Sequence, residues 1–190
     1  MFLNHNIILG SGSPRRSQLL EGLGLTFTVK TKPTDESFPP LLKASEIPLY
    51  LCEQKSIAFS KEELGNSILI TADTIVWIDN EVLNKPADAA EAKAMLRKLS
   101  GKKHEVYTGV CLRQADVLEK FCVLTNVYFK ELSDEEIDYY VSNYKPFDKA
   151  GAYGAQEWMG YIAIEKIEGS YFNVMGLPVM ELWEKLKSNE

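Results

Sequence analysis

The strongest constraint on the fold is a continuous β-branched run, Ser67–Ile78, near the middle of the chain. Runs of this kind suit a central strand covered on both faces, because a strand with one solvated face alternates apolar and polar residues. A single acidic residue, Asp73, interrupts the run. An unpaired carboxylate buried there would be costly. Two interpretations remain open: Asp73 is a strand-end ligand for a hard cation such as Mg²⁺ or Mn²⁺, or it caps a turn.

Strand-like and helix-like segments alternate on either side of this run. The expected strands are Asn6–Leu9, Thr26–Thr31, His104–Arg113, Leu118–Phe129 and Tyr161–Ile167, with a hairpin through Asp79-Asn80 to Glu81–Leu83. The expected helices are one opened by Ser13-Pro14, then Ser45–Lys61, Asp88–Leu99, Ser133–Tyr144 and Leu177–Lys187. We therefore predict an α/β fold in one domain over residues 1–190, a pattern that also allows two lobes around a central cleft.

Composition excludes several functional classes. The 190 residues, 45% of them hydrophobic, are enough for a substantial core. Three cysteines and two histidines are too few for a disulfide framework or a histidine-rich metal site. A net charge of -6 argues against binding to a nucleic-acid polymer. No apolar run could span a membrane and the N-terminal segment lacks the basic region of an export signal, so we expect a cytoplasmic protein.

The turn after the first expected strand has the features of an anion site. Small residues and Ser13-Pro14 lead into a helix whose first turn carries Arg15 and Arg16. Backbone N–H groups and the positive end of the helix dipole attract anions, and forked guanidinium groups fit phosphate oxygens. The alternative is a helix capped by Ser13, with a solvated basic first turn. The spacing matches neither the P-loop nor the dinucleotide-binding pattern.

Other segments suggest chemistry only in combination. Asp35-Glu36 in a proline-rich loop, Lys55 in a helix and Lys85 after the hairpin are each typical of ordinary surface when taken alone. The segment Asp148–Gln156 combines two glycines, an aromatic ring, a lysine and an amide. Such a set can hold a base by stacking and hydrogen bonds, although an ordinary tight loop is the alternative. Together with the basic turn and Asp73, these groups indicate metal-assisted hydrolysis of a nucleotide.

Six motifs resemble, in order and spacing, the series found in the Maf family. They are Ser11–Arg16, Ala72–Val76, Lys85-Pro86, Leu96–Gly101, Asp148–Gly154 and Val174–Pro178, and they span nearly the whole chain. Members of this family are nucleoside triphosphate pyrophosphatases, once described as septum-formation inhibitors. The resemblance implies an elongated mixed β-sheet with flanking helices, two lobes around a deep cleft, and in many cases a homodimer.

The resemblance also implies roles for individual residues. Asp73 matches the family's proton acceptor, and Glu36 matches its partner in binding Mg²⁺ or Mn²⁺ and in catalysis. Lys55 and Lys85 match the family's catalytic lysines. The implied substrate-binding positions are Ser11, Ser13, Arg15, Arg16, Thr74 and Gln156.

Three of these positions favour one branch of the family. Arg15, Thr74 and Gln156 match the dTTP/UTP pyrophosphatases and not the branch that acts on 7-methyl-GTP. Two departures flank Gln156, since Ala155 stands where isoleucine is common and Glu157-Trp158 follows where glycine is usual. The predicted reaction converts dTTP or UTP to the monophosphate and pyrophosphate. The alternatives are a non-catalytic nucleotide-binding regulator of cell division and a pyrophosphatase for modified nucleotides.

Overall fold

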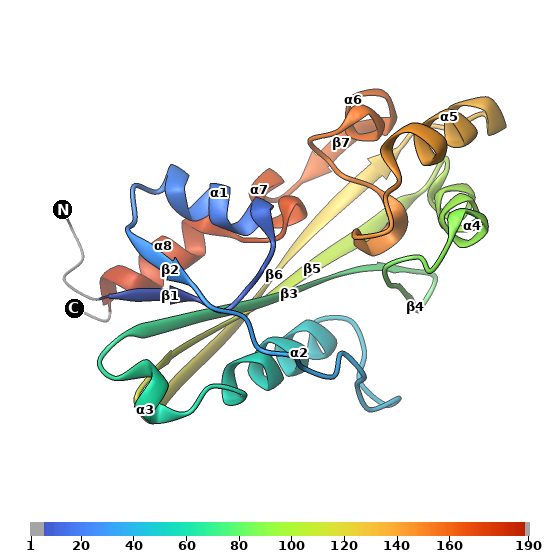
Figure 1. Ribbon diagram of the computed structural model, residues 1–190. Helices are drawn as coiled ribbons and strands as arrows, with labels where there is room; N and C mark the ends of the chain where they lie inside the picture. Colours follow the sequence, from blue (N-terminus) through green and yellow to red (C-terminus); the bar gives the residue numbers. More distant parts are fainter. Residues whose placement is uncertain (1–5, 189–190) are drawn as a thin grey trace. The chain divides into compact units, whose positions relative to one another are not determined.

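The computed structural model describes residues 6–188, which divide into two compact units (Figure 1). Unit 1 holds the chain up to Asp73, Thr108–Val123 and the chain from Gly176 onward, whereas unit 2 holds Thr74–Tyr107 and Leu124–Met175. The expectation of one domain over residues 1–190 stays a prediction, and residues 1–5 and 189–190 lie outside the described part.

The described strands form one mixed sheet of seven strands. They are β1 (Ile7–Leu9), β2 (Phe27–Val29), β3 (Ile68–Ile78), β4 (Glu81–Leu83), β5 (Lys103–Gln114), β6 (Val117–Phe129) and β7 (Ile164–Glu168). Their order is β2-β1-β3-β5-β6-β7, with β4 paired to β3. β1 is parallel to β2 and β3, while β4 and β7 run antiparallel to β3 and β6. The predicted mixed α/β fold is confirmed, and the cleft between two lobes stays a prediction.

Helices cover the strands of each unit. Unit 1 contains α1 (Pro14–Gly22), α2 (Glu46–Ile57), α3 (Lys61–Leu64) and α8 (Val179–Ser188). Unit 2 contains α4 (Ala89–Leu99), α5 (Asp134–Tyr144), the 3₁₀ turn η1 (Ala150–Ala152), α6 (Trp158–Ala163) and α7 (Tyr171–Met175). In Figure 1, α1 and α8 lie on one side of the unit 1 strands and α2 and α3 lie on the other. Helix α4 packs against α5 and η1.

Helix α2 is fixed on the sheet of unit 1 by close polar and steric contacts. The hydroxyl of Thr71 in β3 donates to the carbonyl oxygen of Cys52 in α2 at 2.7 Å. A Cβ atom on Gly109 in β5 would lie 2.5 Å from the carbonyl carbon of Pro48, so glycine is required for this approach. The continuous burial of β3 from Ile68 to Asp73 confirms the central strand that its sequence predicts.

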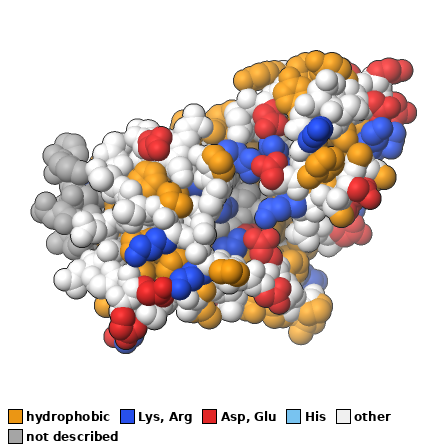
Figure 2. Space-filling model, in the orientation of Figure 1, with side chains coloured by type: hydrophobic (Ala, Val, Ile, Leu, Met, Phe, Trp, Pro, Cys, Tyr) orange, Lys and Arg blue, Asp and Glu red, His pale blue; other side chains and the backbone are white. Residues whose placement is uncertain are grey.

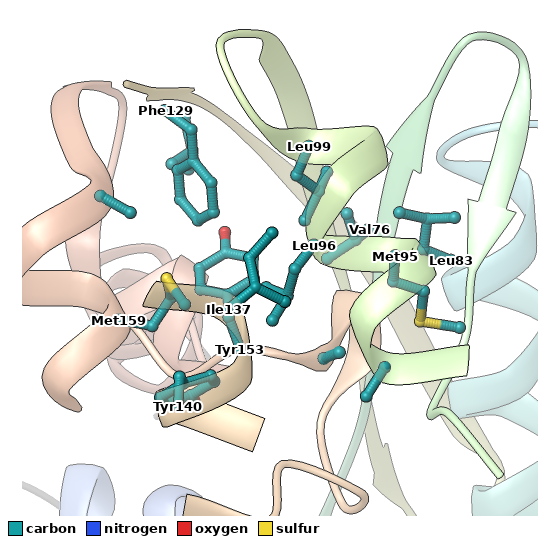
Figure 3. Close-up of a cluster of buried hydrophobic side chains, with 14 of the residues drawn as sticks. Val76, Leu83, Met95, Leu96, Leu99, Phe129, Ile137, Tyr140, Tyr153 and Met159 are labelled. Carbon is teal, nitrogen blue, oxygen red and sulfur yellow. The ribbon is translucent and has the colours of Figure 1, made fainter. Parts of the chain in front are cut away.

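The core of unit 2 is aromatic and aliphatic. Figure 3 shows the rings of Phe129 and Tyr153 facing aliphatic side chains of α4, among them Leu96 and Leu99. The ring centroids of Phe129 and Tyr153 lie 4.9 Å apart in an edge-on arrangement. This cluster anchors the segment around residues 150–156 on the sheet, because Tyr153 and Ala155 both belong to it.

Local capping and turn signals are confirmed. Asp79 and Asn80 have φ angles of 52° and 62°, as a two-residue hairpin turn requires. Asp88 accepts a hydrogen bond from the Glu91 backbone at the start of α4, and Ser133 forms a complete capping box with Glu136 at the start of α5.

Two predicted elements differ from the structure. The strand predicted over Tyr161–Ile167 is helix α6 up to Ala163, and β7 begins only at Ile164. Met159 and Ala163, four residues apart, are both buried, which is the spacing of a helix face. The helix predicted over Ser45–Lys61 ends at Ile57, because Ser60 starts the separate α3 with its own capping box.

No helix in the described part of the chain is long and apolar enough to cross a membrane. Figure 2 shows basic and acidic side chains intermixed over the face drawn. The net charge of -6 is therefore not gathered into one acidic patch on this face.

His104 is buried as a neutral ring in the unit 2 core. It is 1% exposed, and its Nε2 lies 2.8 Å from the hydroxyl oxygen of Tyr153. Its Nδ1 has no hydrogen-bond partner within residues 6–188. Burial lowers the pKa of this imidazole from 6.5 to about 3.

This burial makes stability depend on pH. Above pH 6.5 His104 is neutral in both states, whereas below it the unfolded chain takes up a proton that the folded protein excludes until about pH 3. We expect the free energy of unfolding to fall by about 2 kcal/mol from this group alone between pH 6.5 and about pH 5. Urea unfolding of the wild type and of His104→Gln at several pH values measures this contribution. The contribution of His5 cancels in the comparison, because both proteins contain that residue. Equal pH dependence in the two proteins would contradict this account.

Candidate active site

The turn between β1 and α1 is built by close backbone approach. The N–H of Gly10 donates to the carbonyl oxygen of Ile70 at 2.8 Å, which extends the pairing of β1 with β3. A Cβ on Gly10 would lie 2.6 Å from the Thr71 methyl group, so the position needs glycine. Ser13 is the N-cap residue of α1, but its side chain makes no capping hydrogen bond. The predicted capping role of Ser13 is therefore wrong, and the positive end of this helix keeps its attraction for an anion.

Arg16 is held firmly at this turn. Its Nε donates to the Gly176 carbonyl oxygen at 2.8 Å, and its Nη1 donates to the Ser11 hydroxyl oxygen at 3.1 Å. The same Ser11 oxygen accepts from the backbone N–H of Ser13 at 3.3 Å. Burial lowers the pKa of the Arg16 guanidinium, an effect that Asp73 opposes and Arg15 reinforces. Arg16 is therefore a fixed cation close enough to Asp73 to interact with its charge.

A lysine lies between two carboxylates in unit 1. The ammonium of Lys55 is 2.5 Å from Asp73 Oδ1 and 3.0 Å from Glu36 Oε1. The Lys55 and Asp73 side chains are only 16% and 12% exposed, whereas that of Glu36 is 50% exposed. Removing one member of a buried pair leaves an uncompensated charge, which typically costs about 3–5 kcal/mol. Lys55 thus neutralises the acid that interrupts the apolar strand.

The register of α2 on β3 explains this meeting. Thr71 and Asp73 are two residues apart on a strand, so they project from the same face. Cys52 and Lys55 are three residues apart on a helix, so they share one side of it. The hydrogen bond from Thr71 to Cys52 therefore brings Lys55 onto Asp73.

Glu36 reaches the same lysine from an exposed loop. Asp35 folds the loop locally, since Oδ1 and Oδ2 accept from the N–H and the hydroxyl of Ser37 at 2.9 and 2.7 Å. These bonds lower the pKa of the Asp35 carboxyl. Glu36 thus lies between Asp35 and Ser37, whose hydrogen bonds to each other fix this part of the loop.

The donor set of Asp73 and Glu36 fits a hard divalent cation. Both carboxylates approach one ammonium nitrogen, so a single ion could contact both of them. Within residues 6–188 no group of three or more His, Cys, Asp or Glu side chains could form a closed metal cage. Mg²⁺ normally binds one or two carboxylates together with water and substrate phosphates, so two carboxylates are sufficient.

The remaining predicted site residues belong to unit 2. Thr74 follows Asp73 on β3, Lys85 is exposed just after β4, and Gln156 is half-buried just before α6. Gln156 Oε1 is buried and has no hydrogen-bond partner within the described chain. A buried amide oxygen without a partner is costly, which suits an atom that a ligand satisfies. That these residues form one site with those of unit 1 stays a prediction.

The structure decides between the two interpretations left open for the loop before Gln156. Its aromatic ring, Tyr153, is 6% exposed and is packed against Phe129 and His104. Because this ring lies in the core, it does not serve base stacking, and the alternative of an ordinary tight loop holds for Tyr153. The lysine of the loop, Lys149, is also buried, and its ammonium contacts Asp148 at 2.7 Å and Glu157 at 3.0 Å.

Two residues that shape these loops had no predicted role. Gly176, whose carbonyl oxygen accepts from Arg16, lies 160 residues further along the chain, inside the Val174–Pro178 motif. That motif was the available signal for Gly176. Glu157 was noticed only because it replaces the usual glycine. That substitution was the available signal, although no sequence pattern identified the partners of Glu157.

Comparison with known proteins decides the family. A model of the family described as Maf-like protein matches residues 6–189. The chain belongs to the Maf family. It is 54% identical over 184 residues to the dTTP/UTP pyrophosphatase of Phocaeicola vulgatus, with 96% of this chain and 95% of that protein covered. It is 52% identical over 191 residues to the dTTP/UTP pyrophosphatase of Cytophaga hutchinsonii, with 98% and 87% covered.

A solved structure supports the fold of this Maf protein independently. The Ham1 protein of Staphylococcus aureus superimposes with a TM-score of 0.57, covering 97% of this chain and 100% of that one. Only 14% of the aligned residues are identical, so the likeness concerns the fold alone.

The anchoring of the Gln156 loop can be tested at Gly151. This residue has a φ of +67°, and a Cβ would lie 2.9 Å from the Val76 side chain. Gly24 has a φ of +71° with no atom within 4 Å, so it isolates the backbone cost. We expect Gly24→Ala to cost about 1 kcal/mol of unfolding free energy, and Gly151→Ala about 2–3 kcal/mol, in chemical denaturation. Equal losses would show that the loop does not press against β3.

Proposed function

We propose that this Maf protein hydrolyses dTTP and UTP to the monophosphate and pyrophosphate. Relatives about half identical over nearly their whole length carry the name of this activity. The observation that carries the proposal is the Lys55 ammonium held between the Asp73 and Glu36 carboxylates, with Arg16 close to Asp73. Phosphate binding alone would require the cations but not two carboxylates. The carboxylate pair therefore favours catalysis over a regulator that only binds nucleotide.

The basic residues would hold the triphosphate and stabilise its developing charge. Arg16 is oriented by Gly176 and Ser11, so its guanidinium is positioned before substrate arrives. Arg15 in the same helical turn adds a second forked donor, while Ser11 and Ser13 line the turn. Lys55 and Lys85 would neutralise the leaving pyrophosphate. Losing one preorganised donor of this kind costs on the order of 100–1000-fold in rate.

Asp73 would act as the general base. Its carboxylate accepts a proton from the attacking water, whose oxygen forms a new bond to phosphorus. The anhydride bond between the first and second phosphates breaks, and pyrophosphate leaves with the bonding electron pair. Lys55, already at hydrogen-bond distance from Oδ1, would keep this carboxylate oriented throughout.

Glu36 and Asp73 are the residues that would hold a divalent cation, Mg²⁺ or Mn²⁺. When bound, such an ion lowers the pKa of a water molecule and screens phosphate oxygens. The exposed position of Glu36 leaves this carboxylate accessible to an ion that arrives with the nucleotide.

Gln156 would read the base together with Thr74 and Arg15. Its buried Oε1 can accept the N3 hydrogen of uracil or thymine, while its amide N–H donates to a base carbonyl oxygen. Cytosine presents the reversed pattern at these atoms. A homodimer and a cytoplasmic location stay predictions.

Substitution of Asp73, the proposed general base, tests the hydrolytic step. We expect Asp73→Asn to lower kcat for dTTP by at least about 1000-fold, because the amide cannot accept the proton. Asp79→Asn is the matched control, since this exposed turn residue pairs with the surface Lys102 and lies outside the proposed site. Initial rates and circular dichroism of both variants make the comparison. Full activity of a folded Asp73→Asn protein would rule out Asp73 as the base.

A nucleotide panel tests the substrate class. With Mg²⁺ or Mn²⁺ present, we expect turnover of dTTP and UTP to exceed that of CTP, GTP, ATP and 7-methyl-GTP by about 100-fold in kcat/KM. Preference for another nucleotide would keep the chemistry and overturn the role given to Gln156. Tight binding without turnover of any of them would favour the non-catalytic regulator.

A further inference from the structure

The carboxylate of Glu157 is the centre of a partly buried polar network in unit 2. Its Oε2 accepts a hydrogen bond from the Tyr140 hydroxyl at 2.7 Å, and its Oε1 lies 3.0 Å from the Lys149 ammonium. Lys149 is 7% exposed and Tyr140 is fully buried. A hydrogen bond to a charged acceptor in such surroundings is about twice as strong as a neutral one. Glu157 is therefore fixed to helix α5 on one side and to the start of its own loop on the other.

The same network holds the backbone on both sides of Gln156. The Tyr140 hydroxyl oxygen also accepts from the backbone N–H of Gly154 at 3.2 Å, so one hydroxyl joins the residues at either end of the short Gly154–Glu157 turn. The backbone N–H of Glu157 donates to the Gly154 carbonyl oxygen at 3.1 Å and closes this turn. The Tyr161 hydroxyl donates to the carbonyl oxygen of Gln156 itself at 2.9 Å.

Close packing leaves this turn little freedom. A Cβ on Gly154 would lie 2.8 Å from the Glu157 carboxyl carbon, and one on Gly160 would lie 1.9 Å from the Ala155 carbonyl oxygen. The Glu157 side chain therefore fills the space over Gly154, while α6 closes against the residue before Gln156. A glycine at position 157 would have neither the carboxylate nor this contact.

We propose that Glu157 is a positioning residue that sets the selectivity of Gln156 for uracil and thymine over cytosine. The inference rests on the proposed function. An amide can read either base, because turning it by 180° exchanges its donor and acceptor. Selectivity for uracil over cytosine therefore depends on the backbone position that carries the Gln156 amide. A displacement of about 1 Å at this position would strongly reduce the discrimination between the two bases. Glu157 touches no substrate in this role and acts only through the backbone that carries Gln156.

Glu157→Gln is the central variant. The new amide oxygen can still accept from Tyr140, but the charge that attracts Lys149 is lost, and Lys149 keeps its contact with Asp148. The fold should therefore survive while the turn loosens. Glu136→Gln is the matched control: it removes an ion pair with Lys130 at 2.7 Å in the same unit, and glutamine still completes the capping box. Tyr140→Phe loosens the turn from the opposite side without changing a charge.

The measurement is the ratio of affinities for nonhydrolysable α,β-imido analogues of UTP and CTP, determined by calorimetry. We expect Glu157→Gln and Tyr140→Phe to reduce this ratio about 10-fold and to raise KM for dTTP similarly, with kcat changed less than about threefold. Glu136→Gln should leave the ratio unchanged. In a Gln156→Ala background, Glu157→Gln should have no further effect on the ratio, because its influence passes through Gln156.

The outcomes separate this inference from the proposed function. An unchanged ratio in a folded Glu157→Gln protein, with a uracil-selective and active wild type, would overturn the positioning role alone. An equal fall in the Gln156→Ala background would overturn it too, since Glu157 would then act by another route. A wild type that neither discriminates nor hydrolyses these nucleotides would overturn the proposed function, and the inference with it.

Discussion

A carboxylate on the central strand of an apolar sheet has to be neutralised, and in this protein Lys55 does so for Asp73. The ammonium lies 2.5 Å from Asp73 Oδ1, and both side chains are largely buried. The pair is possible because the Thr71 hydroxyl fixes α2 at the register that brings Lys55 over β3. Gly109 contributes to the same packing of α2 on the sheet, because only a residue without a Cβ allows the close approach of Pro48. One ion pair thus links the packing of unit 1 to its chemistry.

The groups around that pair are arranged to receive an anion. Glu36 adds a second carboxylate to the same ammonium from an exposed loop, and Arg16 is held by Gly176 and Ser11 within electrostatic reach. The uncapped start of α1 contributes the positive end of a helix dipole. In the free protein, burial lowers the pKa of the Arg16 guanidinium, and the carboxylates oppose this effect. The arrangement suits a triphosphate accompanied by a divalent cation.

Local patterns in the sequence were sufficient for most elements of the fold. The apolar run predicted the central strand, and its one aspartate was left open between a metal ligand and a turn cap. The partner that the structure shows, Lys55, comes from a distant helix and was not predicted from the run. Patterns failed where distant packing decides the outcome. Tyr153 was a candidate for stacking on a base, but its ring packs in the core against His104 and Phe129. Tyr161 was predicted to lie in a strand, but it belongs to helix α6. The partners of Glu157, Tyr140 in α5 and Lys149 in the following loop, could not be identified from spacing along the chain.

The central claim is that the Asp73–Lys55–Glu36 arrangement directs water to the anhydride bond between the first and second phosphates. The most direct test is the stoichiometry of products formed from dTTP by the wild-type protein with Mg²⁺. The account predicts dTMP and pyrophosphate in equal amounts, with no orthophosphate released in step with turnover. Formation of dTDP and orthophosphate would place the attack at a different phosphorus and contradict the account, as would bound nucleotide that is never hydrolysed.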